Sequence, residues 1–121
     1  MIIIKRNGKF NIPAGDAFVG CDKENSPVVK EFFVEDVIDL SLIFRMTLLF
    51  DDGTSRFFIL ESEVTDGGTR LKWNATREQI YKDGIVKMQI KASNPSGLVF
   101  HSEQANLVVR TSVELENVVN G

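Results

Sequence analysis

The feature that most constrains this 121-residue chain is the alternation of apolar residues between Leu42 and Leu60. Every second residue of the first half is apolar, and the intervening ones are mixed: the apolar set is Leu42, Phe44, Met46, Leu48 and Phe50. This two-residue period is typical of a strand with one buried face. Asp51-Asp52-Gly53 then has turn chemistry, and a second apolar run begins at Phe57. The stretch predicts a β-hairpin, and because an isolated hairpin is marginally stable, the rest of the chain must cover its apolar face.

The remaining pattern predicts further short strands. The runs that alternate, or that pair with an alternating run, are Val28–Val37, Leu71–Ala75, Ile85–Ala92, Leu98–His101 and Ala105–Arg110. The last two are either separate strands or one strand broken by a bulge near Glu103. Thr76 and Gln79 match a capping box, which predicts one short helical turn before Gly84. Short strands at hairpin spacing favour an all-β, antiparallel β-sandwich, and a small barrel is the alternative.

The length fits a single domain, 1–121, that buries roughly two thirds of its unfolded surface. We expect residues 1–27 to form an N-terminal arm and a loop, in which Ile2 to Phe10 is either a weak edge strand or a partly loose arm, 28–110 the core, and 111–121 a tail. Glu61 to Thr69 is expected to be a polar turn. The shared phase of the alternating runs predicts one core with two facing sets: Leu42, Phe44, Met46 and Leu48 against Trp73, Val86, Met88 and Ile90.

Charge and cysteine content exclude several classes of protein. The net charge is −3 and the basic residues are scattered, which argues against a nucleic-acid partner. A single cysteine, Cys21, excludes a scaffold held by intrachain disulfides. The apolar start at Ile2–Ile4 is too short for a signal peptide or a membrane span, so we expect no membrane partner and production in the cytoplasm.

Candidate catalytic residues lack the neighbours that chemistry requires. His101 is the only histidine, and the adjacent Ser102 and Glu103 point to different faces of a strand or lie a residue apart. Cys21 follows a glycine and precedes an aspartate, with no histidine nearby to activate its thiol. The expectation is a protein that is not an enzyme, with no catalytic residues.

The residues that could bind a metal or a sugar also have a structural explanation. Asp51, Asp52 and Asp66 could meet as oxygen ligands for calcium, but their glycine neighbours explain them as turn residues, so we expect no metal and no cofactor. Trp73 and Tyr81 could form a stacking platform for a carbohydrate. Because Trp73 alternates in phase with the buried-type residues beside it, it is expected in the core. A carbohydrate-binding module, the alternative function, would need two or more exposed aromatic residues on one face.

The alternation itself indicates a partner surface. If Phe44, Met46 and Leu48 point inward, then Ile43 and Leu49 must point outward, together with either Phe57 or Phe58. Contiguous exposed apolar residues usually mark a site of protein contact. The predicted partner surface is therefore Ile43, Leu49 and Phe57.

Several motifs resemble the N-terminal domain of baseplate upper proteins of Firmicutes phages. The matching segments lie within about 28–115, and they are Phe32-Phe33-Val34-Glu35-Asp36, Phe44-Arg45-Met46-Thr47, Asp52-Gly53-Thr54, Leu71 to Thr76, Tyr81 to Ile90 and Leu98 to Ser102, closing on Leu107-Val108-Val109.

The resemblance implies an immunoglobulin-like sandwich without catalysis, acting as a structural module of a phage or prophage tail tip or baseplate. It also implies other tail proteins, or a second copy, as partners, and a location in the virion. Longer family members continue into receptor-binding parts, so for this chain the resemblance predicts docking and not host recognition.

Overall fold

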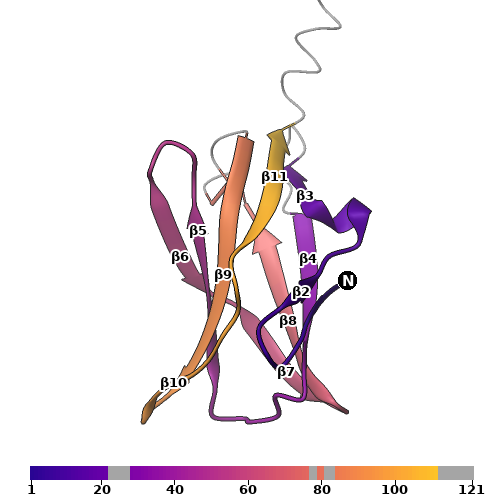
Figure 1. Cartoon of the computed structure of the whole chain (residues 1–121), viewed down its shortest axis with the longest axis vertical. Helices are drawn as coiled ribbons and strands as arrows, with labels where there is room; N and C mark the ends of the chain where they lie inside the picture. Colours follow the sequence, from indigo (N-terminus) through magenta and orange to yellow (C-terminus); the bar gives the residue numbers. More distant parts are fainter. Residues whose placement is uncertain (22–27, 77–78, 81–83, 112–121) are drawn as a thin grey trace, which may run out of the picture.

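The computed structural model describes residues 1–21, 28–76, 79–80 and 84–111, and these form two β-sheets packed as a sandwich (Figure 1). The five-stranded sheet has the order β2-β1-β4-β8-β7. Its strands are β1 (Ile2–Ile4), β2 (Phe10–Asn11), β4 (Val28–Glu35), β7 (Glu61–Thr65) and β8 (Gly68–Ala75).

The six-stranded sheet has the order β3-β11-β9-β5-β6, with β10 paired to β9. Its strands are β3 (Phe18–Cys21), β5 (Ile43–Leu49), β6 (Ser55–Ile59), β9 (Gly84–Asn94), β10 (Gly97–His101) and β11 (Ala105–Thr111). One 3-10 helix, η1 (Ala14–Ala17), lies between β2 and β3. The all-β sandwich predicted from the alternation is confirmed.

The strand order is that of an immunoglobulin-like sandwich. The run β1-β4-β8-β7 corresponds to strands A, B, E and D, and β11-β9-β5 to G, F and C, with β6 in the place of the strand that variable-type domains add next to C. The expectation of purely antiparallel pairing needs one correction, because β1 pairs with β4, and β3 with β11, in parallel. Both parallel pairs are made by strands of the N-terminal segment, β1 in the five-stranded sheet and β3 in the six-stranded sheet.

The central hairpin forms as predicted. Phe44 is 1% exposed and Met46 and Leu48 are 0% exposed, whereas the residues between them face solvent. Met88 and Ile90 are also buried, but they lie beside Leu48 and Met46 on the neighbouring strand β9 and not across the core. Of the residues expected to face the hairpin, Trp73 lies in the opposite sheet. Alternation gives the phase of a strand but not its sheet, and the predicted arrangement was wrong in this respect.

A single residue, Leu60, carries the chain from one sheet to the other. It separates β6 from β7, is 4% exposed, and its N–H donates to the carbonyl oxygen of Phe44 at 2.9 Å. The stretch 61–69, expected to be a turn, is instead β7, a short turn and the start of β8. Because β7 is an edge strand with polar exposed residues, it lacks the apolar alternation that would reveal it.

Of the two alternatives for Ile2 to Phe10, the structure has a strand and not a loose arm, and the N-terminal segment is part of the sandwich. Ile2 and Ile4 are 0% exposed, and β1 pairs with residues 32–34 of β4. The turn after β1 contains Gly8, whose φ is +91° and whose missing side chain leaves room for the His101 carbonyl oxygen, 2.8 Å from the position of a Cβ. The Glu103 N–H donates to the Gly8 carbonyl at 2.8 Å, so this turn packs against the break between β10 and β11.

The predicted helical turn after Thr76 falls mostly on residues 77–78 and 81–83, which lie outside the described residues. Of the two side-chain bonds expected of the capping box, the described part has the one in which Gln79 reaches back to Thr76. The N–H groups of Gln79 and Ile80 donate to the Thr76 carbonyl, both at 3.0 Å, and the Gln79 side chain accepts from the Thr76 N–H at 3.3 Å. The described helical element, η1, lies in a segment expected to be a loop.

Removal of the Phe44 side chain tests whether this residue of the central hairpin lies in the core. Phe44→Ala should lower the free energy of unfolding by about 3–5 kcal/mol, because it removes a fully buried ring. Phe57→Ala is the control, since that ring is 69% exposed on the adjacent strand, and it should cost no more than about 1 kcal/mol. Urea denaturation followed by Trp73 fluorescence measures both, and equal losses would contradict the described alternation.

Candidate functional site

The outer face of the six-stranded sheet carries exposed apolar side chains on β5 and on the edge strand β6. Ile43 is 50% exposed, Leu49 38% and Phe57 69%, as the alternation predicts for the partner surface. Ile59, 67% exposed and two residues after Phe57, joins them, and the sequence analysis missed it although its phase could have revealed it. These four residues are called the apolar strip below.

The two adjacent phenylalanines of β6 have opposite roles. Phe57 lies on the outer face, and the guanidinium carbon of Arg45 lies 5.9 Å from its ring centroid, within range of a cation–π contact. Phe58 points inward and stacks on Trp73, with ring centroids 5.6 Å apart and an interplanar angle of 22°. The register therefore selects Phe57, and not Phe58, as the outward ring.

Positive charge is concentrated in this sheet. Its described strands contain no aspartate or glutamate, although the chain as a whole carries a net charge of −3. They contain five basic residues, namely Arg45, Arg56, Lys87, Lys91 and Arg110. Arg45 and Lys91 lie directly opposite each other on the outer face, and like charges in that position destabilise a sheet. The outer face is thus both apolar and basic.

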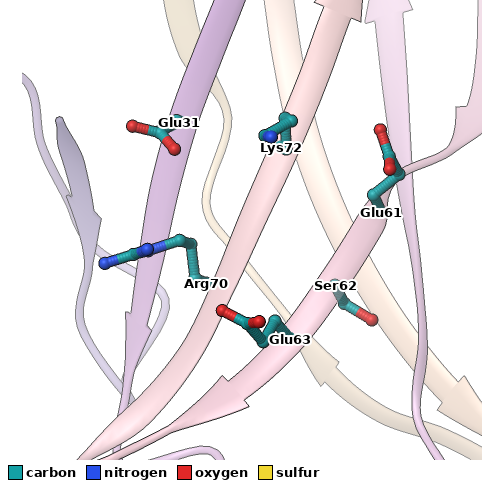
Figure 2. Close-up of a pocket in the computed structure, with 6 residues that line it drawn as sticks. All are labelled: Glu31, Glu61, Ser62, Glu63, Arg70 and Lys72. Atoms are coloured by element: carbon teal, nitrogen blue, oxygen red, sulfur yellow. The ribbon is translucent and has the colours of Figure 1, made fainter.

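The five-stranded sheet has a different outer face. A shallow hollow of about 280 Å³ is lined by Glu31, Glu61, Ser62, Glu63, Arg70 and Lys72, and Figure 2 shows these side chains spread across β4, β8 and β7. Lys72 lies between Glu31 and Glu61 in the register, and Arg70 lies opposite Glu63. Alternating opposite charges of this kind stabilise an exposed sheet, so the hollow has a structural explanation.

Ser102 and Glu103, which follow the only histidine, hydrogen-bond to backbone groups. His101 is exposed on the outer face opposite Lys91. Ser102 is 0% exposed, and its hydroxyl accepts from the Ile90 N–H at 2.9 Å and donates to the Glu103 carbonyl at 2.8 Å. The Glu103 carboxylate accepts from the Phe10 N–H at 3.1 Å. These bonds hold the predicted break between β10 and β11, and they do not form a nucleophile–base pair.

The aspartates weighed as calcium ligands lie apart. Asp51 and Asp52 belong to the turn before β6, whereas Asp66 belongs to the turn after β7, at the other end of the sandwich (Figure 1). The Asp52 carboxylate accepts from the Thr54 N–H at 2.9 Å, as a turn residue does. Among the described residues, no three histidine, cysteine, aspartate or glutamate side chains come together as metal ligands.

Of the three remaining candidates, the structure describes Trp73 in full, but it describes neither Tyr81 nor the side chain of Cys21. Trp73 is 2% exposed, and its indole N–H donates to the Gln79 side chain at 2.9 Å, so it belongs to the core as its phase predicted. Tyr81 lies outside the described residues. Cys21 ends β3, and its side chain is likewise outside the described part of the structure.

One buried cation lies at the end of the core. Lys30 is 8% exposed, in phase with Phe32, and its ammonium donates to the Asp16 carbonyl at 2.9 Å. Burial lowers the pKa of Lys30, and the Asp16 carboxylate, 3.9 Å away, opposes that shift. The pKa of Asp16 is lowered chiefly by a hydrogen bond from the Met1 amino group at 2.8 Å. These contacts fix η1 against the sandwich.

The pKa of Asp39, in the loop between β4 and β5, is also lowered. The Asp39 carboxylate accepts from the hydroxyl and the N–H of Ser41, at 2.6 and 2.9 Å, and these bonds lower its pKa. Both residues are exposed between β4 and β5. The shift therefore reflects a local turn.

No protein-family model matches this chain, and no curated protein matches it. No helix in the described part is long and apolar enough to cross a membrane. The outer face of the six-stranded sheet is the surface whose composition the fold itself does not explain, and it is the candidate functional site.

The role of Ser102 is testable. Ser102→Ala should lower the free energy of unfolding by about 1–3 kcal/mol, because the Ile90 N–H would lose its acceptor in a buried position. His101→Ala is the matched control in the same segment, and because His101 is exposed it should change stability by no more than about 0.5 kcal/mol. Thermal or urea unfolding compares the two, and an equal effect would contradict a backbone role for Ser102.

Proposed function

We propose that this chain is a non-enzymatic β-sandwich module that acts by protein contact through the outer face of its six-stranded sheet. The observation that carries the proposal is the exposure of the apolar strip, Ile43, Leu49, Phe57 and Ile59, on a rigid sheet. Large apolar patches on soluble proteins usually mark an interaction site. The strip is contiguous, because Phe57 and Ile59 lie on β6 next to the strand that carries Ile43 and Leu49.

The composition of this face also suits a protein partner. Interface centres are enriched in aromatic residues and arginine, and they are depleted of carboxylates. Phe57 with Arg45 over its ring provides the first two features at the centre of β5 and β6. Around them lie polar and basic residues, Thr47, Gln89 and Lys87, which are suited to the hydrated margin of a contact.

The biological setting that we propose is a phage or prophage tail tip or baseplate, with other tail proteins or a second copy as partners. The support is the resemblance of segments such as Phe44-Arg45-Met46-Thr47 and Leu71 to Thr76 to the N-terminal domain of baseplate upper proteins. A virion module of this kind would assemble by surface contact, which agrees with the apolar strip.

The carbohydrate-binding alternative has less support. Among the aromatic side chains that the structure describes, Phe57 is the exposed one, and stacking on a sugar would need at least two on one face. Trp73 is buried, stacked on Phe58 and bonded to Gln79. No observation on the described surface favours a sugar.

The test introduces a charge into the apolar strip. Ile43→Glu and Leu49→Glu should each weaken association about tenfold or more, because a carboxylate buried in the contact loses its hydration. Sedimentation over a range of concentrations measures the mass of the chain alone and in mixtures with candidate tail proteins. Val29→Glu is the matched control, since Val29 is 51% exposed on the other sheet and should leave association unchanged.

A wild type that stays monomeric at high concentration, binds none of those proteins, and has the same solubility as the Ile43→Glu and Leu49→Glu variants would contradict the proposal. Equal weakening by Val29→Glu would also contradict it, because the contact would then not lie on the six-stranded sheet.

A further inference from the structure

The outer edge of β6 has backbone groups directed away from the sheet. In the hairpin, the Phe50 N–H donates to the Thr54 carbonyl and the Leu60 N–H to the Phe44 carbonyl, both at 2.9 Å. Antiparallel pairs alternate between bonded and non-bonded, so with the register of β5 and β6 the groups of Ser55, Phe57 and Ile59 point away from β5. No strand in the described part of the chain pairs with this edge, which is the left margin of the sheet in Figure 1.

Space for side chains flanks the same edge. Two hollows, of about 330 and 140 Å³, lie beside β6, and both are lined by Phe58 and Gln79. The smaller one also reaches Trp73, the only tryptophan of the chain. The exposed side chains of Phe57 and Ile59 lie on the outer face of the same strand. A strand added to this edge would therefore place one set of side chains beside Phe57 and the other set in the hollows.

Charge argues against simple pairing of two β6 edges. About a two-fold axis at Phe57, the two Phe57 rings would be neighbours, and each has an Arg45 guanidinium over it. The two arginines would be brought together on a face that has no carboxylate on its described strands. Like charges so placed repel, so the edge favours an incoming strand that carries negative charge.

The chain contains a segment with these properties. Residues 112–121 include Glu114 and Glu116 and no lysine or arginine. The glutamates alternate with Val113 and Leu115, the two-residue pattern that puts acidic side chains on one face of a strand and apolar ones on the other. Beside β6, the glutamates would meet Arg45 and the apolar residues would meet the Phe58 hollows.

The distance from the end of β11 to the outer edge of β6 determines whether residues 112–121 can come from the same copy. β11 ends at Thr111 and is separated from β6 by β9 and β5, so a strand beyond β6 lies about 19 Å from β11 at the usual strand spacing. Crossing that distance takes about six extended residues. Glu114 and Glu116 would be used up in the crossing, so they can lie along β6 only when they come from another copy.

We infer that residues 112–121 of one copy add as a strand to the outer edge of β6 of a second copy, with Glu114 and Glu116 beside Arg45 and with Val113 and Leu115 in the hollows at Phe58. The inference rests on the proposed function, for which it names the partner and the mode of contact. Main-chain hydrogen bonds give the affinity in such strand addition, and the side chains give the specificity.

The first experiment is a charge exchange in the full-length chain, read by sedimentation. The double variant Glu114→Lys with Glu116→Lys, and the single variant Arg45→Glu, should each weaken self-association about tenfold or more. Combining all three substitutions should restore it to within a few-fold of wild type. The control is Glu31→Lys with Glu63→Lys, which makes the same change in net charge on the other sheet and should have no effect.

The second experiment locates the contact by amide hydrogen exchange. The Phe57 amide should be protected when the wild type associates and should exchange rapidly in the Glu114→Lys, Glu116→Lys variant at the same concentration. Association that is lost in Ile43→Glu but is unaffected by the tail variant, with an unprotected Phe57 amide, would overturn strand addition and leave the proposed function intact. Protection of the Phe57 amide in a monomer at every concentration would overturn the assignment to a second copy. A wild type that does not self-associate would overturn the inference, while the proposed function would still be tested by binding to other tail proteins.

Discussion

The two-residue period of β5 is the constraint on which both the core and the outer face depend. Its even-numbered residues, Phe44, Met46 and Leu48, are nearly inaccessible, and this commits Ile43 and Leu49 to the outer face. The register of β5 is held on one side by β9 and on the other by β6, where the Leu60–Phe44 bond closes the pairing. A slip of one residue would exchange the two faces and bury Arg45, so the outer surface is specified as strictly as the core.

The outer face differs from what folding alone would select. On the five-stranded sheet, Glu31, Lys72 and Glu61 lie in one row, and opposite charges are neighbours. On the six-stranded sheet, Arg45 faces Lys91 and the apolar strip is exposed. Both features reduce the stability or solubility of the isolated domain. The contact proposed above would bury the apolar strip and bring negative charge to the cations, and so would offset both effects.

A strand could be predicted from the sequence where one of its faces is buried and the other exposed. β5 and β9 have one wet and one dry face, so their alternation revealed the strands and the buried residues. β1 has three residues and pairs in parallel, and β7 is polar at an edge, so neither has a readable period. The choice between Phe57 and Phe58 depends on register, because both belong to one apolar run.

For the candidate site, the sequence predicted which residues face outward but not which strands are neighbours. Ile43, Leu49 and Phe57 followed from the alternation, and Ile59 could have followed from it too. The like-charge pair Arg45–Lys91 could not, since it requires knowing that β5 and β9 are neighbours. For the same reason the sequence analysis treated the basic residues as scattered, whereas five of them lie on the strands of one sheet, at Arg45, Arg56, Lys87, Lys91 and Arg110.

Of the edge strands β2, β7 and β6, β6 is the least protected against pairing with another chain. Exposed edges invite pairing with other chains, and proteins usually protect them with charges or keep them short. β7 carries Glu61 and Glu63, and β2 has only two residues. The outward-directed residues of β6 are uncharged and largely apolar, so this edge lacks both protections. Variable-type immunoglobulin domains place a further strand at the corresponding position, which shows that the geometry of the sandwich accepts one there. A strand added there as inferred above would also place negative charge beside Arg45, so the edge would favour an acidic strand over a neutral or basic one.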